Sequence, residues 1–192
     1  MPRIIRAADC RRMPWKNGGG ETTEIAISPA GAGLDNFDWR VSMAKVETSG
    51  PFSSFAGIDR TLAILEGQGM VLEIDGREPS MLTAEAAPLS FPADVPTFAE
   101  LTGGPITDLN VMTRRGRLTH SVSRLDIAGP MAFASAAGTV LLLCVSGNIQ
   151  VKTGPLQAIL ARFDTFLAER SDFPIEIEAA PRAGVVKVEI SS

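Results

Sequence analysis

Short apolar runs bounded by turn residues recur along almost the whole sequence, and this pattern constrains the fold more than any other feature. Runs such as Met70–Ile74 and Val140–Val145 are too short for core helices but have the length of buried strands. Turn signals such as Asp75–Gly76 close them. Many short strands at close spacing are typical of a sandwich or a barrel. The sequence therefore predicts an all-β fold, with one short helical turn at Ala7–Met13 that ends before Pro14.

Several segments alternate between apolar and polar residues, so their two faces differ. Because side chains two apart share a strand face, Arg40 and Ser42 lie together, and so do Asp108 and Asn110. These polar faces either point to water or line a lumen, where charges must be paired or bound by a ligand. The predicted strands are Thr22–Ile27, Trp39–Val46, Leu62–Leu65, Met70–Ile74, Asp108–Thr113, Val140–Val145, Leu156–Leu160 and Val185–Ile190.

Composition narrows the class of protein. The chain of 192 residues is long enough for one large domain or two small fused ones. A net charge of −4 argues against a nucleic-acid partner, which usually selects a basic patch. Cys10 and Cys144 are far apart and make a poor disulfide framework, which fits a reducing compartment. With no signal peptide and no apolar run of the ~20 residues that a membrane helix needs, we expect a cytoplasmic protein with no membrane partner.

The common catalytic and cofactor motifs are missing from the sequence. The chain has one histidine, His120, and no second histidine or cysteine lies near it in the sequence to suggest a metal site. Gly18–Gly20 precedes a strand, so it lacks the helix-terminus amides of a phosphate loop. The Gly-x-Ser-x-Gly motif of a nucleophile elbow is also absent. We therefore predict no catalytic residues, no cofactor and no metal ligands.

A faint internal repeat suggests two related halves. Leu62–Gly67 resembles Leu142–Gly147 at an offset of 80 residues, and each is followed by a strand, a turn and another strand. Such a repeat predicts two similar β-barrels fused in one chain.

Four ordered blocks carry a resemblance to a known family. They are Pro14–Gly20 followed by Thr23–Ile25, then Trp39–Ser42, then Gly50–Phe55 with Gly57–Arg60, and finally Asp108–Arg115. Together they resemble the HutD/Ves family. The resemblance implies a bicupin, that is, two fused cupin-type double-stranded β-barrels with few short helices. Residues 1–115 would form the N-terminal barrel with the ligand pocket, and residues 116–192 a structural C-terminal barrel without a polar constellation. Strands can be exchanged between the two, and a homodimer is an open expectation.

The metal-binding pattern of cupins can be set against this sequence. When Gly50 and Gly69 frame that pattern, its ligand positions fall on Ala56, Ile58 and Leu62. None of these side chains can hold a metal ion. The resemblance therefore implies a metal-free lumen.

The resemblance also implies a ligand. Family members are thought to bind a small carboxylate of histidine utilisation, with formylglutamate, urocanate and formate as candidates, and to tune the pathway. Arginine forks suit a carboxylate, and aromatic rings supply apolar walls. Glu24 and Asp108 either orient the arginines or neutralise them. The ligand-binding residues carried over by the blocks and faces are Trp15, Lys16, Asn17, Glu24, Arg40, Ser42, Phe55, Arg60, Asp108 and Asn110.

Two other functions remain open from the sequence. The first is a metal-independent enzyme acting on a small organic acid, with Glu24 and Lys16 as an acid–base pair. The second is a structural or interaction protein without a ligand, whose polar faces neutralise each other.

Overall fold

The computed structural model describes residues 1–172 and 174–192, and their contacts divide them into two compact units. Unit 1 comprises residues 1–10 and 120–192, and unit 2 comprises residues 11–119. The first residues belong to unit 1 because strand β1 (Arg3–Ile5) pairs antiparallel with β17 (Thr165–Glu169). Within the described residues, no helix has the length and apolar character required to cross a membrane.

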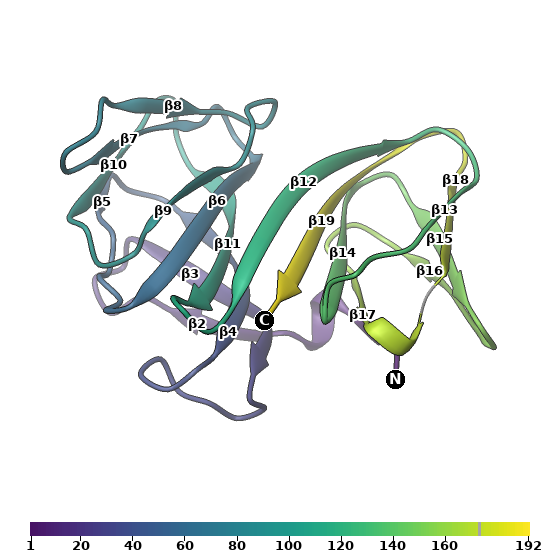
Figure 1. Cartoon of the computed structure of the whole chain (residues 1–192). Helices are drawn as coiled ribbons and strands as arrows, with labels where there is room; N and C mark the ends of the chain where they lie inside the picture. Colours follow the sequence, from purple (N-terminus) through teal and green to yellow (C-terminus); the bar gives the residue numbers. More distant parts are fainter. Residues whose placement is uncertain (173) are drawn as a thin grey trace. The chain divides into compact units, whose positions relative to one another are not determined.

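Unit 2 consists of a six-stranded and a four-stranded antiparallel sheet (Figure 1). The six-stranded sheet has the order β2 (Arg11–Pro14), β3 (Gly20–Ser28), β4 (Trp39–Val46), β11 (Ile106–Arg114), β6 (Ile58–Glu66) and β9 (Leu89–Pro92). The four-stranded sheet has the order β5 (Gly50–Pro51), β10 (Thr97–Leu101), β7 (Met70–Ile74) and β8 (Ser80–Leu82).

Unit 1 has a five-stranded and a four-stranded sheet. The five-stranded sheet has the order β1, β17, β14 (Thr139–Ser146), β19 (Ala183–Ser191) and β12 (Thr119–Ile127). The four-stranded sheet has the order β13 (Met131–Phe133), β18 (Ile175–Ala179), β15 (Ile149–Thr153) and β16 (Leu156–Leu160). The described helical turns are the 3₁₀ turns Ala7–Asp9 and Arg170–Asp172.

The two units repeat one strand order. The order β4-β11-β6-β9 of unit 2 matches β12-β19-β14-β17 of unit 1, and β5-β10-β7-β8 matches β13-β18-β15-β16. Gly67 and Gly147 end the matching strands β6 and β14 with positive φ angles of 93° and 69°. A Cβ atom would lie 2.7 Å from the Pro105 carbonyl oxygen at Gly67, and 2.5 Å from that of Arg182 at Gly147. The weak sequence repeat is therefore a structural one, and glycine is required at both turns for the same reasons.

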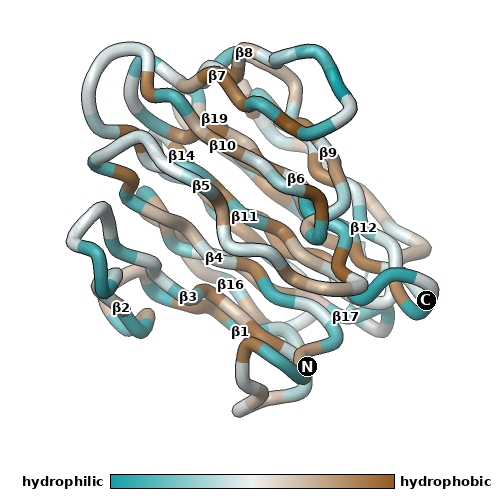
Figure 2. The backbone as a smooth tube through the Cα atoms, turned by 90° about the vertical axis from the view of Figure 1, so that its left-hand side faces the viewer, coloured by the Kyte–Doolittle hydropathy of each residue, from teal (hydrophilic) through white to brown (hydrophobic). Residues whose placement is uncertain are grey.

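The sheets of unit 2 pack face to face around an apolar core. One strand face supplies each layer because side chains alternate across a strand. The core contains Ala44, Val46, Leu62, Ile64, Phe91 and Ile106 from the larger sheet and Met70, Leu72, Ile74, Leu82 and Ala99 from the smaller. Figure 2 shows hydrophilic segments gathered in many of the connecting loops.

The helical turn predicted over Ala7–Met13 is mostly wrong. The 3₁₀ turn ends at Asp9, and Arg11–Pro14 pairs with β3 as strand β2. Pro14 is tolerated there because β2 is an edge strand, so one side of it needs no ladder donor. The proline after a helical pattern predicted a helix end, but pairing with β3 stabilises Arg11–Pro14 as a strand instead.

Candidate functional site

A cavity of about 580 Å³ lies within unit 2 and has a size typical of small-ligand sites. Its wall includes every predicted site residue except Glu24. The lining residues used below are Trp15, Lys16, Asn17, Thr22, Leu34, Arg40, Ser42, Phe52, Ser53, Phe55, Arg60, Ala99, Asp108, Asn110 and Met112.

Strand register brings the polar residues together. In the ladders on either side of β11, Met112 lies opposite Arg40 of β4 and opposite Arg60 of β6. Two residues before Met112 on the same face of β11, Asn110 lies opposite Ser42 of β4. Both arginines thus project from one face, at one level, on the two sides of β11. These side chains are buried, with Arg40 5% and Asp108 0% exposed, so the alternative that the polar faces point to bulk water is wrong.

The glycine-rich hairpin between β2 and β3 holds the aromatic side of the cavity mouth. The Trp15 amide donates to the Gly20 carbonyl at 2.9 Å, and the Trp15 indole donates to Thr22 Oγ1 at 2.8 Å. Asn17 Oδ1 accepts from the Gly19 amide at 3.0 Å, which uses one end of its amide for the turn itself. Lys16 is exposed. The hairpin therefore fixes the indole ring and leaves a lysine at the entrance.

Arg40 is matched by an acid. Its Nε donates to Glu24 Oε2 at 2.8 Å, across the ladder in which Glu24 lies opposite Ser42. Glu24 therefore acts on the cavity through Arg40 and does not line it. The described residues show no contact between Glu24 and Lys16, the acid–base pair that the sequence offered for an enzyme.

Arg60 has a different environment. It is 2% exposed, and its Cζ atom lies 5.2, 5.3 and 5.8 Å from the ring centroids of Phe52, Phe55 and Phe91. Its Nη2 donates to the Ser53 carbonyl at 3.3 Å, whereas Nε has no partner within the described residues. Burial lowers the pKa of Arg60 to about 10, so the side chain stays charged at neutral pH. A cation held among three rings, without a hydrogen-bonded acid, favours an anion beside it.

Asp108 is the second unusual group. Asn110 Nδ2 donates to its Oδ1 at 2.6 Å, the Ala44 backbone amide also favours its ionised form, and its buried Oδ2 accepts no hydrogen bond of standard geometry in the described part of the chain. Burial raises the pKa of Asp108 to about 7, against the opposing attraction of Arg60. Near neutral pH the carboxyl is therefore partly protonated and cancels the charge of Arg60 incompletely. With Arg40 matched by Glu24, part of the positive charge of Arg60 is left for a ligand inside the cavity.

Some lining residues were missed by the sequence analysis. Phe52 belongs to the Gly50–Phe55 block, and its place beside Arg60 could have been suspected from that block. Thr22 shares a face with Glu24 by simple alternation. Leu34, on the β3–β4 connection, is 53% exposed at the cavity wall, and nothing in its local sequence marks it.

In unit 1, the strand that corresponds to β11 carries a lysine and a glutamate near the position equivalent to Asn110. Lys187 lies opposite Leu142 in β14 as Asn110 lies opposite Leu62 in β6. The Lys187 ammonium contacts Glu189 Oε2 at 2.8 Å, and Ser135 Oγ donates to Glu189 Oε1 at 2.5 Å. Residues 116–192 thus contain a small polar cluster at these positions. The charges of this cluster match one another, so it offers no spare charge to a ligand.

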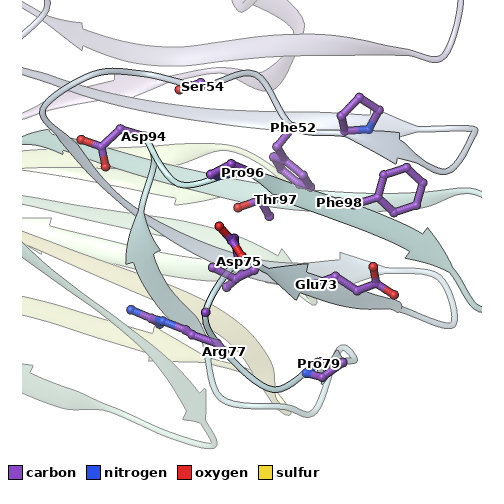
Figure 3. A pocket seen from close by; sticks show the side chains of 13 residues that line it. Phe52, Ser54, Glu73, Asp75, Arg77, Pro79, Asp94, Pro96, Thr97 and Phe98 are labelled. Carbon is purple, nitrogen blue, oxygen red and sulfur yellow. The ribbon is translucent and has the colours of Figure 1, made fainter.

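An open groove of about 770 Å³ adjoins the cavity of unit 2 and shares Pro51 and Phe52 with its wall (Figure 3). Phe98 at its wall is 40% exposed. Figure 3 shows the carboxylates of Glu73 and Asp94 pointing in different directions rather than toward a common point. Asp94 is already bound by Arg115 at 3.0 Å. This groove lacks the convergent polar groups of the cavity that Arg40 and Arg60 line, which is called the arginine cavity below.

The positions framed by the cupin metal pattern hold apolar side chains. Ile58 and Leu62 are 3% and 0% exposed and belong to apolar clusters. Across residues 1–172 and 174–192, no three histidine, cysteine or acidic side chains gather as a metal site requires.

Two sandwiches of one strand order, one of them with an arginine-lined cavity, define a bicupin that carries a candidate anion site. A cupin 2 conserved barrel domain protein from Leptotrichia buccalis shares this fold with a TM-score of 0.64, covering 97% of this chain and 100% of that chain, at 8% identity. The family model described as HutD matches residues 7–186. The chain belongs to the HutD family.

Proteins with higher sequence identity to this chain cover most or all of its length. An uncharacterised 21.2 kDa protein in the hutC 3′ region of Pseudomonas putida is 36% identical over 97% of this chain and 96% of its own length. Protein Ves of Citrobacter koseri is 36% identical over 70% of this chain and 71% of its own. A conserved protein of unknown function from Pseudomonas aeruginosa PAO1 superposes with a TM-score of 0.92, 36% identity and full coverage of both chains. HutD from Pseudomonas fluorescens SBW25, solved in a formate condition, gives a TM-score of 0.81 at 34% identity and covers 100% of this chain and 98% of that one.

Proposed function

We propose that this protein binds a small carboxylate in the arginine cavity, without a metal ion, and has a regulatory role linked to histidine utilisation. The observation that carries the proposal is Arg60, a buried guanidinium with a free Nε and no acid hydrogen-bonded to it in the described part of the chain. A buried, incompletely matched charge is costly, and evolution retains such groups mainly at functional sites.

The cavity also supports a choice of ligand. Its interior leaves the charge of Arg60 only partly cancelled, which suits one carboxylate, and Asn110 supplies an amide beside it. Trp15, Phe52 and Phe55 provide apolar walls. Formate, urocanate and formylglutamate each contain a carboxylate that could bind Arg60. The second carboxylate of formylglutamate would lie toward the exposed Lys16.

The link to histidine utilisation comes from the relatives. The family is named HutD, and the Pseudomonas putida relative is described by its place beside hutC. A binding protein of this kind would sense a pathway acid. Its role is tested by comparing the induction of histidine-degrading enzymes in a host with the wild-type chain and in one with the Arg60→Met variant.

Titration calorimetry with formylglutamate, urocanate and formate tests the binding itself. We expect saturable binding of at least one of them, and at least about 30-fold weaker binding by Arg60→Met, because a buried charge-assisted contact is worth about 2 kcal/mol or more. Arg117→Met is the matched control, since it removes an arginine that is 68% exposed and paired with Asp38 in the same unit.

Two results would contradict the proposal. One is an absence of heat with all three acids while circular dichroism shows the wild-type protein folded. The other is equal affinity of Arg60→Met and Arg117→Met. Mass spectrometry of the titrated acids separates binding from turnover, because an enzyme would convert one of them.

A further inference from the structure

Two buried polar atoms of opposite character lie in the wall of the same cavity without partners among the described residues. They are Nε of Arg60, a donor, and Oδ2 of Asp108, an acceptor unless it is protonated. Buried polar atoms without partners are rare in native proteins, and each needs an explanation. Their presence together in one ligand-sized hollow suggests that a ligand completes the arrangement.

The two groups also interact electrostatically. Arg60 stabilises the ionised form of Asp108, and ionised Asp108 stabilises the charged form of Arg60. No ion pair within 4.0 Å joins them in the described part of the chain, so this attraction acts without a direct contact. An anion entering the cavity and the ionised Asp108 would therefore compete for the same guanidinium.

The other charged groups near Asp108 are paired with an acid or lie at the cavity mouth, although Arg40 also lowers the pKa of Arg60 by repulsion. The neighbouring strand β4 supplies Arg40, whose Nε is held by Glu24 of β3. Strand β6 supplies Arg60 itself, and the β2–β3 hairpin places the exposed Lys16 at the mouth. The four-stranded sheet contributes the apolar Ala99 to the wall. Arg60 is thus the cation that both Asp108 and a bound anion depend on.

Resting on the carboxylate-binding function proposed above, we propose that Asp108 is a positioning residue that couples anion binding to proton uptake. It orients the Asn110 amide through Oδ1, and it becomes neutral at Oδ2 when an anion takes over the charge of Arg60. The proton comes from solvent, and no covalent bond of the ligand changes. The ligand class is accordingly a carboxylate that binds ionised while the cavity binds one proton.

The expected pH dependence follows in sign and in size. Below about pH 7 Asp108 is already neutral, so affinity is flat. Above that pH a proton must be taken up, and affinity falls by up to about tenfold per pH unit. Arg60 keeps its charge through this range because its pKa is about 10.

Calorimetry with formylglutamate and with formate tests this coupling, because their carboxyl groups stay ionised above about pH 6, like ordinary carboxylates. Each titration is run at about pH 6 and about pH 8, in buffers of different ionisation enthalpy, so that the heat reports the protons taken up. We expect uptake approaching one proton per ligand at the higher pH, little at the lower pH, and a pH-independent affinity in Asp108→Asn. Asp75→Asn is the control, since it changes an exposed aspartate of the same unit that lines the open groove and not the arginine cavity.

The outcomes separate the two proposals. Ligand binding by the wild type without proton uptake and with flat affinity overturns the coupling and leaves the carboxylate site standing. The coupling is likewise overturned, with the site intact, if Asp108→Asn keeps the wild-type pH dependence. Failure of both acids to bind at either pH overturns the binding function and the coupling with it. If Asp108→Asn does not fold, the proton count of the wild type decides alone.

Discussion

Replacing Asp108 with asparagine is expected to raise the free energy of unfolding by about 2–4 kcal/mol at about pH 8 and to change it little at about pH 4. The wild-type carboxyl has its pKa raised from 3.8 to about 7 by burial. The folded state therefore holds this proton more tightly than the unfolded state, and that contribution to stability is lost as pH rises through about 7. Asparagine is neutral at every pH and can still accept the hydrogen bond from Asn110.

Urea unfolding of both proteins across this pH range measures the effect. Asp75→Asn is again the control and should follow the wild-type curve, since its side chain is exposed. A difference between Asp108→Asn and the wild type that is the same at both pH values would refute the explanation, because a packing change does not titrate. Together with the ligand experiments, this result would show that Asp108 lowers the stability of the protein while serving the binding site.

The second large effect is expected at Gly20, where alanine should lower the free energy of unfolding by about 2–4 kcal/mol. A Cβ atom there would lie 2.3 Å from the carbonyl oxygen of Lys45 and 3.1 Å from the ring of Trp15. The carbonyl belongs to the β3–β4 ladder, in which Gly20 lies opposite Val46, so it cannot move without opening the pairing. The indole at the cavity mouth would be displaced as well, and carboxylate affinity should fall.

Urea unfolding and tryptophan fluorescence report these two consequences. Gly33→Ala is the matched control, because the nearest atom to its added Cβ would lie at 3.7 Å. Equal stabilities of the two variants would show that the strand pairing accommodates the extra methyl group.

The predicted strands were accurate where alternation and turn signals agreed. Trp39–Val46, predicted from alternation, and Met70–Ile74, predicted as a short apolar run closed by a turn, are strands with the predicted bounds. The local sequence was enough to predict these strands, because the order of apolar and polar side chains along a strand determines which face is buried. Ala7–Met13 failed because pairing with a neighbouring strand outweighed a local helical signal.

The predicted site residues other than Glu24 line one cavity, but the sequence did not predict how their charges are paired. Alternation placed Arg40 with Ser42 and Asp108 with Asn110, and the family blocks added the aromatic residues. Which arginine is matched by an acid depends on the β3–β4 register, which shifts between Glu24 and Ala26. A shift of this kind leaves no clear mark in a sequence.

By itself the sequence determined an all-β chain of two related halves, with charged and apolar strand faces, because these features depend on neighbouring residues. Tertiary structure alone decided that Glu24 holds Arg40, that Arg60 lies among three rings with a free Nε in the described part of the chain, and that Asp108 is buried in the same cavity wall. Pairing and burial arise from segments distant along the chain, and the charge left to a ligand is the balance of those long-range contacts.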